Sequence, residues 1–458
     1  EVQSVHRLIE GRLEKMEELG REVELYPYAF RRSHTSAEIR AQEEALTAAG
    51  TAVRLPGRLM AKRGTGKTVF APLQDEWGRI QVYFRKDDLG EQRFRQVSKL
   101  MDIGDWIGVE GTLFRTRTGE LTVHVTDFTF LAKAIRPLPE KYHDMSLELK
   151  SRRRDLDLAM NLESRERFKR RSAIITEIRS FFDGEGFLEV ETPVLQPLYG
   201  GATARPFTTH HNALDSTLYL RIADELYLKR LIIGGLEKVY EIAKDFRNEG
   251  MDRTHNPEFT MLECYAAFWD YTDMMDLTER LLRRLARRFG DEGRLAYDEH
   301  VLDFAQPFAR VRFMDALAAK CGRDLMAATT DEIAGELRSR GLEIKPGMGR
   351  DKMLDELFSL LVEPELVQPT FVMDHPQELS PLAKGHRKTA GLVERFELFT
   401  AGFELANSFS ELNDPREQRQ RFLDQKALIE AGDEEAQQLD EDFLAAMEQG
   451  MPPTGGMG

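Results

Sequence analysis

Cysteine and long apolar runs are scarce in this chain of 458 residues. Its two cysteines, Cys264 and Cys321, are too few for a disulfide framework and lack the spacing of a metal site. No run approaches the roughly 20 apolar residues that a membrane-spanning helix needs. No secretory signal opens the chain, although it begins at Glu1 and not at a methionine. We therefore expect a protein of the reducing cytoplasm, without a membrane segment and with something removed before Glu1.

Excess positive charge is also lacking, since the formal net charge is −15. A uniformly acidic surface would disfavour nucleic acid, but the charge is uneven along the chain. Residues 52–135 contain 14 lysines and arginines against 10 acidic residues, a net of +4, so the remainder carries −19. A local basic face can bind a polyanion whatever the overall charge. The length itself predicts two or more domains.

The first part of the chain predicts a helical arm and then a small β-barrel. Apolar residues recur at helical spacing between Val2 and Leu19, and a second short helix is expected at 36–50, so residues 1–50 form the arm. Five strands with a helix near 91–101 after the third are typical of an OB-fold, expected over residues 51–136. The strands are expected at 52–62, 68–74, 79–85, 105–115 and 120–130.

An OB-fold often binds single-stranded nucleic acid on its strand face. Phe70 and Phe84 could stack on bases there, although a place in the barrel core explains either aromatic equally well. Basic residues that could follow the phosphates are Arg58, Arg63, Lys67 and Arg79.

A second stretch, residues 246–263, places arginines, carboxylates and a histidine in one loop between two apolar runs. The flanking runs alternate like strands, so a hairpin is expected. A loop with Arg247, Glu249, Arg253 and His255 suits a phosphate-bearing ligand, because the planar arginine fork pairs with phosphate oxygens. A charged surface hairpin would show the same composition.

Within this stretch, the pattern F-R-N-E-G-x5-N-P-E-F resembles motif 2 of the class II aminoacyl-tRNA synthetases. The surrounding sequence is most similar to the lysine, aspartate and asparagine subgroup, and above all to its lysine-specific members. Residues 186–195 resemble motif 1, which builds the dimer interface in this family, with Pro193 at that interface. By themselves they would pass for an ordinary helix-to-strand connection.

The resemblance implies an α+β protein. An N-terminal OB-fold barrel would read the anticodon, and a catalytic domain would hold an antiparallel sheet flanked by helices. We expect a linker at 137–158 and the catalytic domain at 159–458, with a helical insertion at about 275–365. The family's motif 3, a Gly-rich strand followed by a helix that bears an arginine, is absent from the sequence. We therefore expect the natural chain to continue beyond Gly458 by roughly one strand and one helix.

The resemblance also implies activation of L-lysine by ATP and its transfer to tRNA-Lys. Arg247, the expected catalytic residue, would bridge the lysine carboxylate and the α-phosphate. Mg²⁺ would bind Glu404 and Glu411, which lie seven residues apart and would converge only with an irregularity in the strand; from spacing alone they would be solvated surface residues. The other ATP ligands would be Glu249 on the adenine amino group, Phe259 stacked on adenine, Arg253 and His255 on the outer phosphates, and Asn256.

A lysine pocket needs anionic partners, because burying an unpaired ammonium is prohibitive. Glu225 would receive the α-ammonium, and Tyr265, Asn413 and Glu417 would surround the ε-ammonium. Gly201, Glu263 and Arg247 complete the implied lysine site. Asp224 stands where the family usually has a proline, and we expect it to cap the following helix.

In the barrel, the resemblance places Phe70 against an anticodon base and Gln81 and Glu120 on base edges. It also implies a homodimer formed through the motif 1 region. The alternatives left open are an aspartate or asparagine enzyme of the same class and a paralogue that binds without aminoacylating. A third is a plain single-strand-binding OB protein, which would leave two thirds of the sequence unused.

Overall fold

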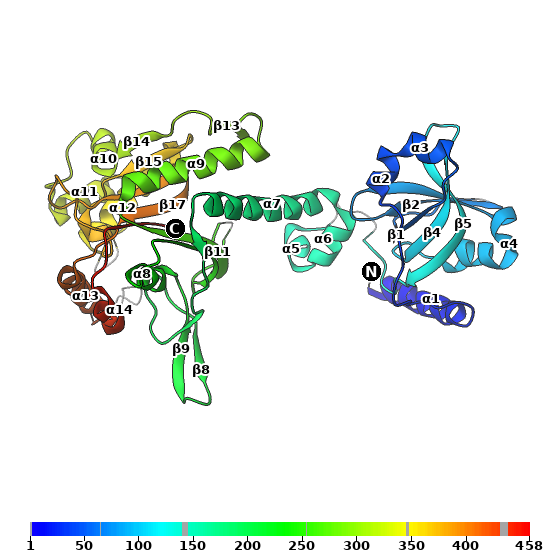
Figure 1. The fold of residues 1–458 in the computed structure, drawn as a ribbon, viewed down its shortest axis with the longest axis horizontal. Helices are drawn as coiled ribbons and strands as arrows, with labels where there is room; N and C mark the ends of the chain where they lie inside the picture. The colour runs from blue at the N-terminus through cyan, green and yellow to red at the C-terminus, as the bar shows by residue number, and fades with distance from the viewer. Residues whose placement is uncertain (1, 65, 140–144, 253, 345–347, 431–437) are drawn as a thin grey trace. The chain divides into compact units, whose positions relative to one another are not determined.

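The computed structural model describes the whole chain except residues 1, 65, 140–144, 253, 345–347 and 431–437 (Figure 1). It forms two compact units, Glu1–Arg170 and Arg171–Gly458. Among the described residues, no helix is both long and apolar enough to cross a membrane.

The first unit is built around a closed five-stranded barrel with the strand order β1-β2-β3-β5-β4. Alternate residues of each strand point inward, as in β3, where Ile80, Val82 and Phe84 are buried. All five expected strands are confirmed, and the OB-fold with them. The elements are α1 Val2–Gly20, α2 Ser36–Ala41, α3 Glu43–Ala48, β1 Val53–Leu59, β2 Thr68–Gln74, β3 Arg79–Arg85, α4 Lys86–Arg95, a π-helical turn Gln96–Leu100, β4 Trp106–Arg115 and β5 Leu121–Ala132.

The stretch expected as a linker contains two short helices, α5 (Leu147–Arg152) and α6 (Arg154–Met160). The Gln74 side chain donates to the Ala159 carbonyl at 2.8 Å, which fastens α6 to the barrel. These residues are therefore structured, because their backbone groups find partners in helices and on the barrel.

The second unit is organised around an eight-stranded sheet with the order β14-β15-β16-β17-β18-β11-β10-β6. The strands from β15 to β10 pair antiparallel, as expected, but the two edge pairs β14/β15 and β6/β10 are parallel, so the sheet is mixed. The strands are β6 Leu188–Glu189, β10 Lys238–Phe246, β11 Glu258–Ala267, β14 Ala309–Arg312, β15 Thr370–Met373, β16 Arg395–Thr400, β17 Phe403–Ser410 and β18 Thr454–Met457.

Helices cover both faces of this sheet. On one face α9 (Tyr271–Phe289) packs Met274, Leu277 and Leu281 against alternate residues of β10 and β11, including Tyr240 and Cys264. On the other face α8 (Glu225–Ile233) packs against the intervening residues, Val239, Tyr265 and Ala267. Successive side chains of a strand point to opposite faces, so one hairpin serves both layers.

The expected helical insertion at 275–365 is only partly helical. It contains a small hairpin, β12 (Arg294–Tyr297) and β13 (His300–Asp303), and β14 forms an edge of the main sheet. Its part of α9 belongs to the core over the sheet. The remaining elements of this unit are α7 Leu162–Gly184, which begins in the first unit, β7 Leu195–Gln196, β8 Thr208–His211, β9 Ser216–Leu220, α10 Phe313–Cys321, α11 Thr330–Ser339, α12 Arg350–Leu361, 3-10 turns at Glu363–Glu365 and Gln377–Leu379, α13 Pro415–Glu430 and α14 Glu441–Met447.

Candidate active site

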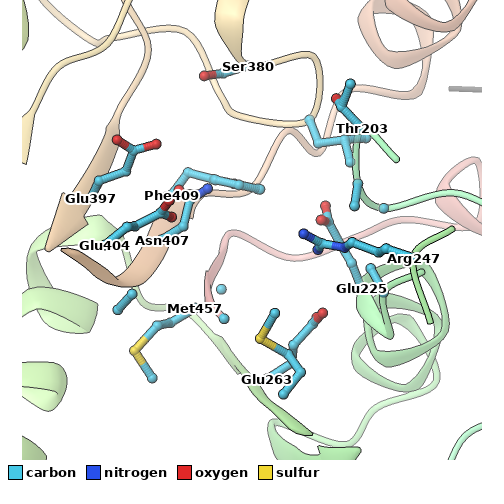
Figure 2. Close-up of a pocket in the computed structure, with 18 of the residues that line it drawn as sticks. Thr203, Glu225, Arg247, Glu263, Ser380, Glu397, Glu404, Asn407, Phe409 and Met457 are labelled. Atoms are coloured by element: carbon cyan, nitrogen blue, oxygen red, sulfur yellow. The ribbon is translucent and has the colours of Figure 1, made fainter. Parts of the chain in front are cut away.

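A cavity of about 620 Å³ opens on the face of the large sheet that α8 shares. This volume suits a small-molecule ligand. Arg247 and Glu225 lie on one side of the view in Figure 2, and Glu397 and Glu404 lie on the other. The expected site residues that line the cavity are Gly201, Glu225, Arg247, Glu249, His255, Asn256, Phe259, Glu263, Tyr265, Glu404 and Glu411.

The β10–β11 hairpin carries the charged loop to this cavity. The Arg247 N–H donates to the Pro257 carbonyl at 2.9 Å and closes the loop across its base. The Arg247 guanidinium lies 5.1 Å from the centre of the Phe259 ring, a cation–π contact. Arg247 is thereby held over the cavity. Arg253 lies outside the described residues.

His255 is oriented by an acidic neighbour on the same loop. Asp252 accepts from the backbone N–H groups of Thr254 and His255 at 2.7 Å each, and its carboxylate lies 2.8 Å from the His255 Nδ1. These hydrogen bonds hold the pKa of Asp252 well below its usual range. Asp252 fixes the ring orientation, and it was not singled out in the sequence.

The floor of the cavity holds two glutamates that share one buried lysine. Lys229 follows Glu225 by one turn of α8 and is ion-paired both with it and with Glu411. All three side chains are buried. Burial lowers the pKa of Lys229, but the charges of the two glutamates more than reverse this and raise it. Lys229 therefore stays charged, but its single positive charge does not balance the two glutamates.

Glu411 comes close to the neighbouring strand because that strand has a glycine there. A Cβ on Gly456 would lie 2.0 Å from a Glu411 oxygen and 2.4 Å from the Tyr265 ring. Only glycine allows both side chains to pass this backbone. The pattern Thr454–Met457 in β18 thus shapes the floor of the cavity.

Glu263 is a buried carboxylate whose hydrogen-bond partners among the described residues are both neutral. One oxygen accepts from the Tyr265 hydroxyl at 3.0 Å and the other accepts from the Asp224 N–H at 3.2 Å. Burial and then the charge of Glu225 raise the pKa of Glu263 to about 8. An ammonium group placed here would relieve that unfavourable charge.

Asp224 occupies the N-cap position of α8, but its side chain makes no capping hydrogen bond, so the expectation of a cap is wrong. The carboxylate is buried and lies 3.2 Å from Arg221 Nε, and Asp245 lies 3.3 Å from the same nitrogen. Arg221 also pairs with Glu241 at 2.8 Å. A single guanidinium cannot neutralise three buried carboxylates. Burial accordingly raises the pKa of Asp224 to about 10.

Glu404 and Glu411 project from the same side of the chain because β17 contains a bulge. Opposite β16, Leu398 pairs with Ala406 and Phe399 pairs with Glu404, so Leu405 has no partner. A spacing of seven would put the two glutamates on opposite faces, and the extra residue restores them to one face. This is the irregularity that the metal assignment requires.

Each of these two glutamates also has a charged neighbour. Glu411 is occupied by Lys229, whereas Glu404 lies near Glu397 of β16, a residue that the sequence reasoning missed. Glu404 is exposed within the cavity, and desolvation by the cavity walls together with the charge of Glu397 raises its pKa to about 8. Arg395 holds Glu397 at 2.5 Å and also donates to Asn407 at 3.0 Å.

Asn407 and Phe409 also line the cavity from β17, and nothing in the sequence reasoning singled them out. Asn413 and Glu417 are not among the residues that line it. Asn413 instead accepts from Lys384 at 2.7 Å, and Glu417 accepts from Arg421 at 2.5 Å within α13. Alternate residues of a strand point to the same face. Counting back from Glu411 in steps of two would therefore have predicted that Phe409 and Asn407 face the cavity as well.

The barrel presents a separate aromatic face, on the outside of the sheet formed by β2, β3, β5 and β4. The rings of Phe70 and Tyr83 lie 4.6 Å apart, and Phe114 and His124 lie within 6.0 Å of Tyr83. All four are half-buried. Phe84, by contrast, is fully buried against Phe128, so its proposed stacking role is wrong.

Of the other two expected anticodon residues, Gln81 neighbours this aromatic face and donates to the Thr122 hydroxyl at 2.9 Å. Glu120 is exposed in the turn before β5.

Comparison with known proteins agrees with both units. Residues 146–458 match the family described as tRNA synthetases class II (D, K and N), and residues 53–131 match the OB-fold nucleic acid binding domain.

Similar full-length relatives include three proteins named lysine–tRNA ligase. The one from Syntrophomonas wolfei is 48% identical over 99% of this chain and 92% of its own length. The Enterococcus faecalis protein is 49% identical over 98% of this chain and 91% of its own length. The Roseiflexus castenholzii protein is 50% identical over 99% of this chain and 94% of its own length. The chain therefore belongs to the class II tRNA synthetases of the aspartate, lysine and asparagine group.

Proposed function

We propose that this chain is an ATP-dependent lysine–tRNA ligase, which activates L-lysine as lysyl-adenylate and transfers it to the 3′ end of tRNA-Lys. The observation that carries the proposal is the acidic floor of the cavity. Glu225, Glu263 and Glu411 face one space, and of the described residues only Lys229 is ion-paired with them. A substrate with two ammonium groups supplies the missing positive charge.

The two ammonium groups of lysine are assigned to different carboxylates of this floor. Glu225 takes the α-ammonium, beside Gly201, whose φ of 89° and close approach to Ala223 disfavour any side chain there. Glu263, with the Tyr265 hydroxyl and Glu411, takes the ε-ammonium. An aspartate substrate would instead require a cation at this end, which disfavours the aspartate alternative. The neutral side chain of asparagine would leave the charge of these glutamates unbalanced, which disfavours the asparagine alternative.

Arg247 bridges the lysine carboxylate and the α-phosphate of ATP in the activation step. The reaction is a displacement at phosphorus, so catalysis depends on positioning and on neutralising developing negative charge. Phe259 stacks on adenine, Glu249 accepts from its amino group, and His255 and Asn256 contact the phosphates. Arg253 keeps the role on the outer phosphates that the sequence predicted for it.

Mg²⁺ is proposed to bind Glu404 and Glu411. The donor set fits, because both glutamates line the cavity and burial raises the pKa of each, a cost that a bound cation would relieve. Bound Mg²⁺ would neutralise phosphate oxygens of ATP. Asn413 and Glu417 are still proposed to belong to the lysine site, although neither is among the residues that line the cavity.

The remaining assignments concern partners and location. Phe70 is proposed to stack on an anticodon base, with Gln81 and Glu120 on base edges. A homodimer through the motif 1 region is supported by apolar side chains there that are 39–52% exposed, namely Leu188, Val194 and Leu195. The cytoplasm is proposed because both cysteines are free, as a reducing compartment keeps them.

Amino-acid-dependent exchange of pyrophosphate into ATP, measured across the twenty amino acids, tests the proposal. Exchange with lysine alone, followed by charging of tRNA-Lys, is the expected result. Exchange with aspartate or asparagine would show that this amino acid, and not lysine, is the substrate. Absence of exchange with any amino acid would favour a paralogue that binds without catalysis.

A further inference from the structure

Lys229 is a buried cation that supports the floor of the cavity from outside it. Its ammonium group is ion-paired with Glu225 and with Glu411. It also lies 5.4 Å from the centre of the Phe409 ring, a cation–π contact. These three partners line the cavity, whereas Lys229 is fully buried and is not among the described residues that line it. Lys229 therefore acts on a ligand through the side chains that it holds.

Of the two glutamates, Glu225 depends more on this lysine. Lys229 follows Glu225 by one turn of α8 and donates to its Oε1, and no other described residue makes a hydrogen bond with the Glu225 side chain. The second oxygen of Glu225 is thus left for a ligand in the cavity. Glu411 is confined by a further contact, because a Cβ on Gly456 would lie 2.0 Å from one of its oxygens. Loss of Lys229 should therefore disturb Glu225 first.

Charge as well as geometry requires a cation at this place. Removal of one partner of a buried ion pair leaves the other as an uncompensated buried charge, which is strongly unfavourable. The Glu225 carboxylate in that state would have to change its orientation or its charge. Either change makes it a poorer partner for an ammonium group.

We propose that Lys229 is a positioning residue that holds the Glu225 carboxylate charged, and with one oxygen free to accept, for the α-ammonium of the amino acid. The inference rests on the proposed function, which assigns that ammonium to Glu225. Lys229 itself touches neither the substrate nor the reacting atoms. Its effect is therefore limited to ligands that carry an α-ammonium, which separates a positioning role from a general structural one.

The experiment compares the wild type with Lys229→Met, which keeps the length of the side chain and removes its charge. Binding of L-lysine and of 6-aminohexanoate, which is lysine without its α-amino group, is measured by calorimetry on the full chain without ATP. We expect Kd for lysine to rise about tenfold or more, the scale for a hydrogen bond between charged groups. Kd for 6-aminohexanoate should not change, because this ligand has no group for Glu225 to bind.

Two further variants connect the effect with Glu225. Glu225→Gln alone should weaken lysine binding, and the addition of Lys229→Met should cause no further loss, because the group that Lys229 positions is already gone. Arg230→Met is the matched control. Arg230 is the next residue of α8 and pairs with Asp440 at 2.9 Å, and neither is among the described residues that line the cavity. This control should keep the wild-type Kd for both ligands.

Three results would overturn the inference. An unchanged Kd for lysine in Lys229→Met would show that the lysine has no role in binding, and equal losses for both ligands would show a general structural role. A further loss on adding Lys229→Met to Glu225→Gln would show that Lys229 acts through another group.

If Lys229→Met does not fold, its combination with Glu411→Gln keeps the net charge of the buried site. This double variant is then compared with Glu411→Gln alone on the same two ligands, with the same expected difference between them. A wild type that binds and exchanges another amino acid and not lysine refutes the proposed function. Lysine binding and exchange that do not depend on Lys229 refute this inference alone.

Discussion

The two binding regions of this chain differ in how they prepare for a ligand. The barrel presents half-buried rings, Phe70, Tyr83 and His124, which already pack against one another on an open face. The cavity instead holds buried carboxylates whose pKa values are raised, such as that of Glu263 at about 8. A base that stacks on the barrel adds contact area to a surface whose rings already pack against one another. A cation that enters the cavity relieves an electrostatic cost that the free protein carries.

This contrast predicts that substitutions in the cavity change chemistry, substrate binding and pH dependence together. Substitutions on the barrel face should change only the affinity for tRNA. The experiments below test that separation, beginning with the largest expected effect.

Arg247→Ala should lower the rate of lysine activation by at least about a hundredfold, the scale for removing a positioned charge stabiliser. The fall should appear in kcat of pyrophosphate exchange, because the guanidinium interacts most strongly with charge that develops in the transition state. Binding of tRNA by the barrel should not change. A rise in KM with kcat retained would show that Arg247 contributes only uniform binding.

Glu263→Gln should weaken lysine binding by about 2–3 kcal/mol, since it removes a charged partner of the ε-ammonium. KM for ATP should stay as in the wild type. Glu258→Gln is the matched control, because Glu258 lies on the same strand but is exposed and pairs with Lys244. Equal losses for lysine and ATP in Glu263→Gln would make Glu263 a structural residue.

Phe70→Ala should weaken tRNA charging by roughly 1–3 kcal/mol, the usual loss for one stacked base. Lysine activation should be unaffected. Phe84→Ala is the contrasting variant, because Phe84 fills the barrel core and its loss should cost about 3–5 kcal/mol of stability. If Phe70→Ala lowered the melting temperature as Phe84→Ala does, the ring would belong to the core and the comparison of the two regions would fail.

The free protein should lose stability as pH rises from about 4.5 to 8. The pKa of Glu263 is about 8 in the folded chain against an ordinary value near 4.5, so in this interval the folded state binds more protons than the unfolded state. The free energy of unfolding then falls with pH, by up to about 1.4 kcal/mol per pH unit for one such group. Chemical denaturation across this range measures the slope.

Glu263→Gln should reduce that slope, and saturating lysine should oppose it, because the bound ammonium stabilises the ionised carboxylate. The same slope in the wild type and in Glu263→Gln would show that Glu263 is not the group responsible. The barrel variant Phe70→Ala should leave the slope as it is, which again separates the two regions.

Local pattern alone predicted the barrel and the charged hairpin. The strands predicted at 68–74 and 79–85 are observed as β2 and β3. This prediction was possible because the alternation of side chains along a strand depends only on residues that are neighbours in the sequence. The loop residues Arg247, Glu249, His255 and Asn256 reach the cavity together for the same reason, since one hairpin carries them all.

The sequence by itself determined which short segments alternate and which residues could carry charge to a ligand. Only the tertiary structure decided which carboxylates meet. The unpaired Leu405 in β17 reverses the side on which every later residue of that strand lies, and the register of β16 then brings Glu397 toward Glu404. Likewise Asp245 of β10 converges with Arg221 and Asp224, which lie between β9 and α8, and these buried contacts replace the expected helix cap. A bulge and a cross-strand register depend on pairing between distant segments, so no local pattern of residues encodes them.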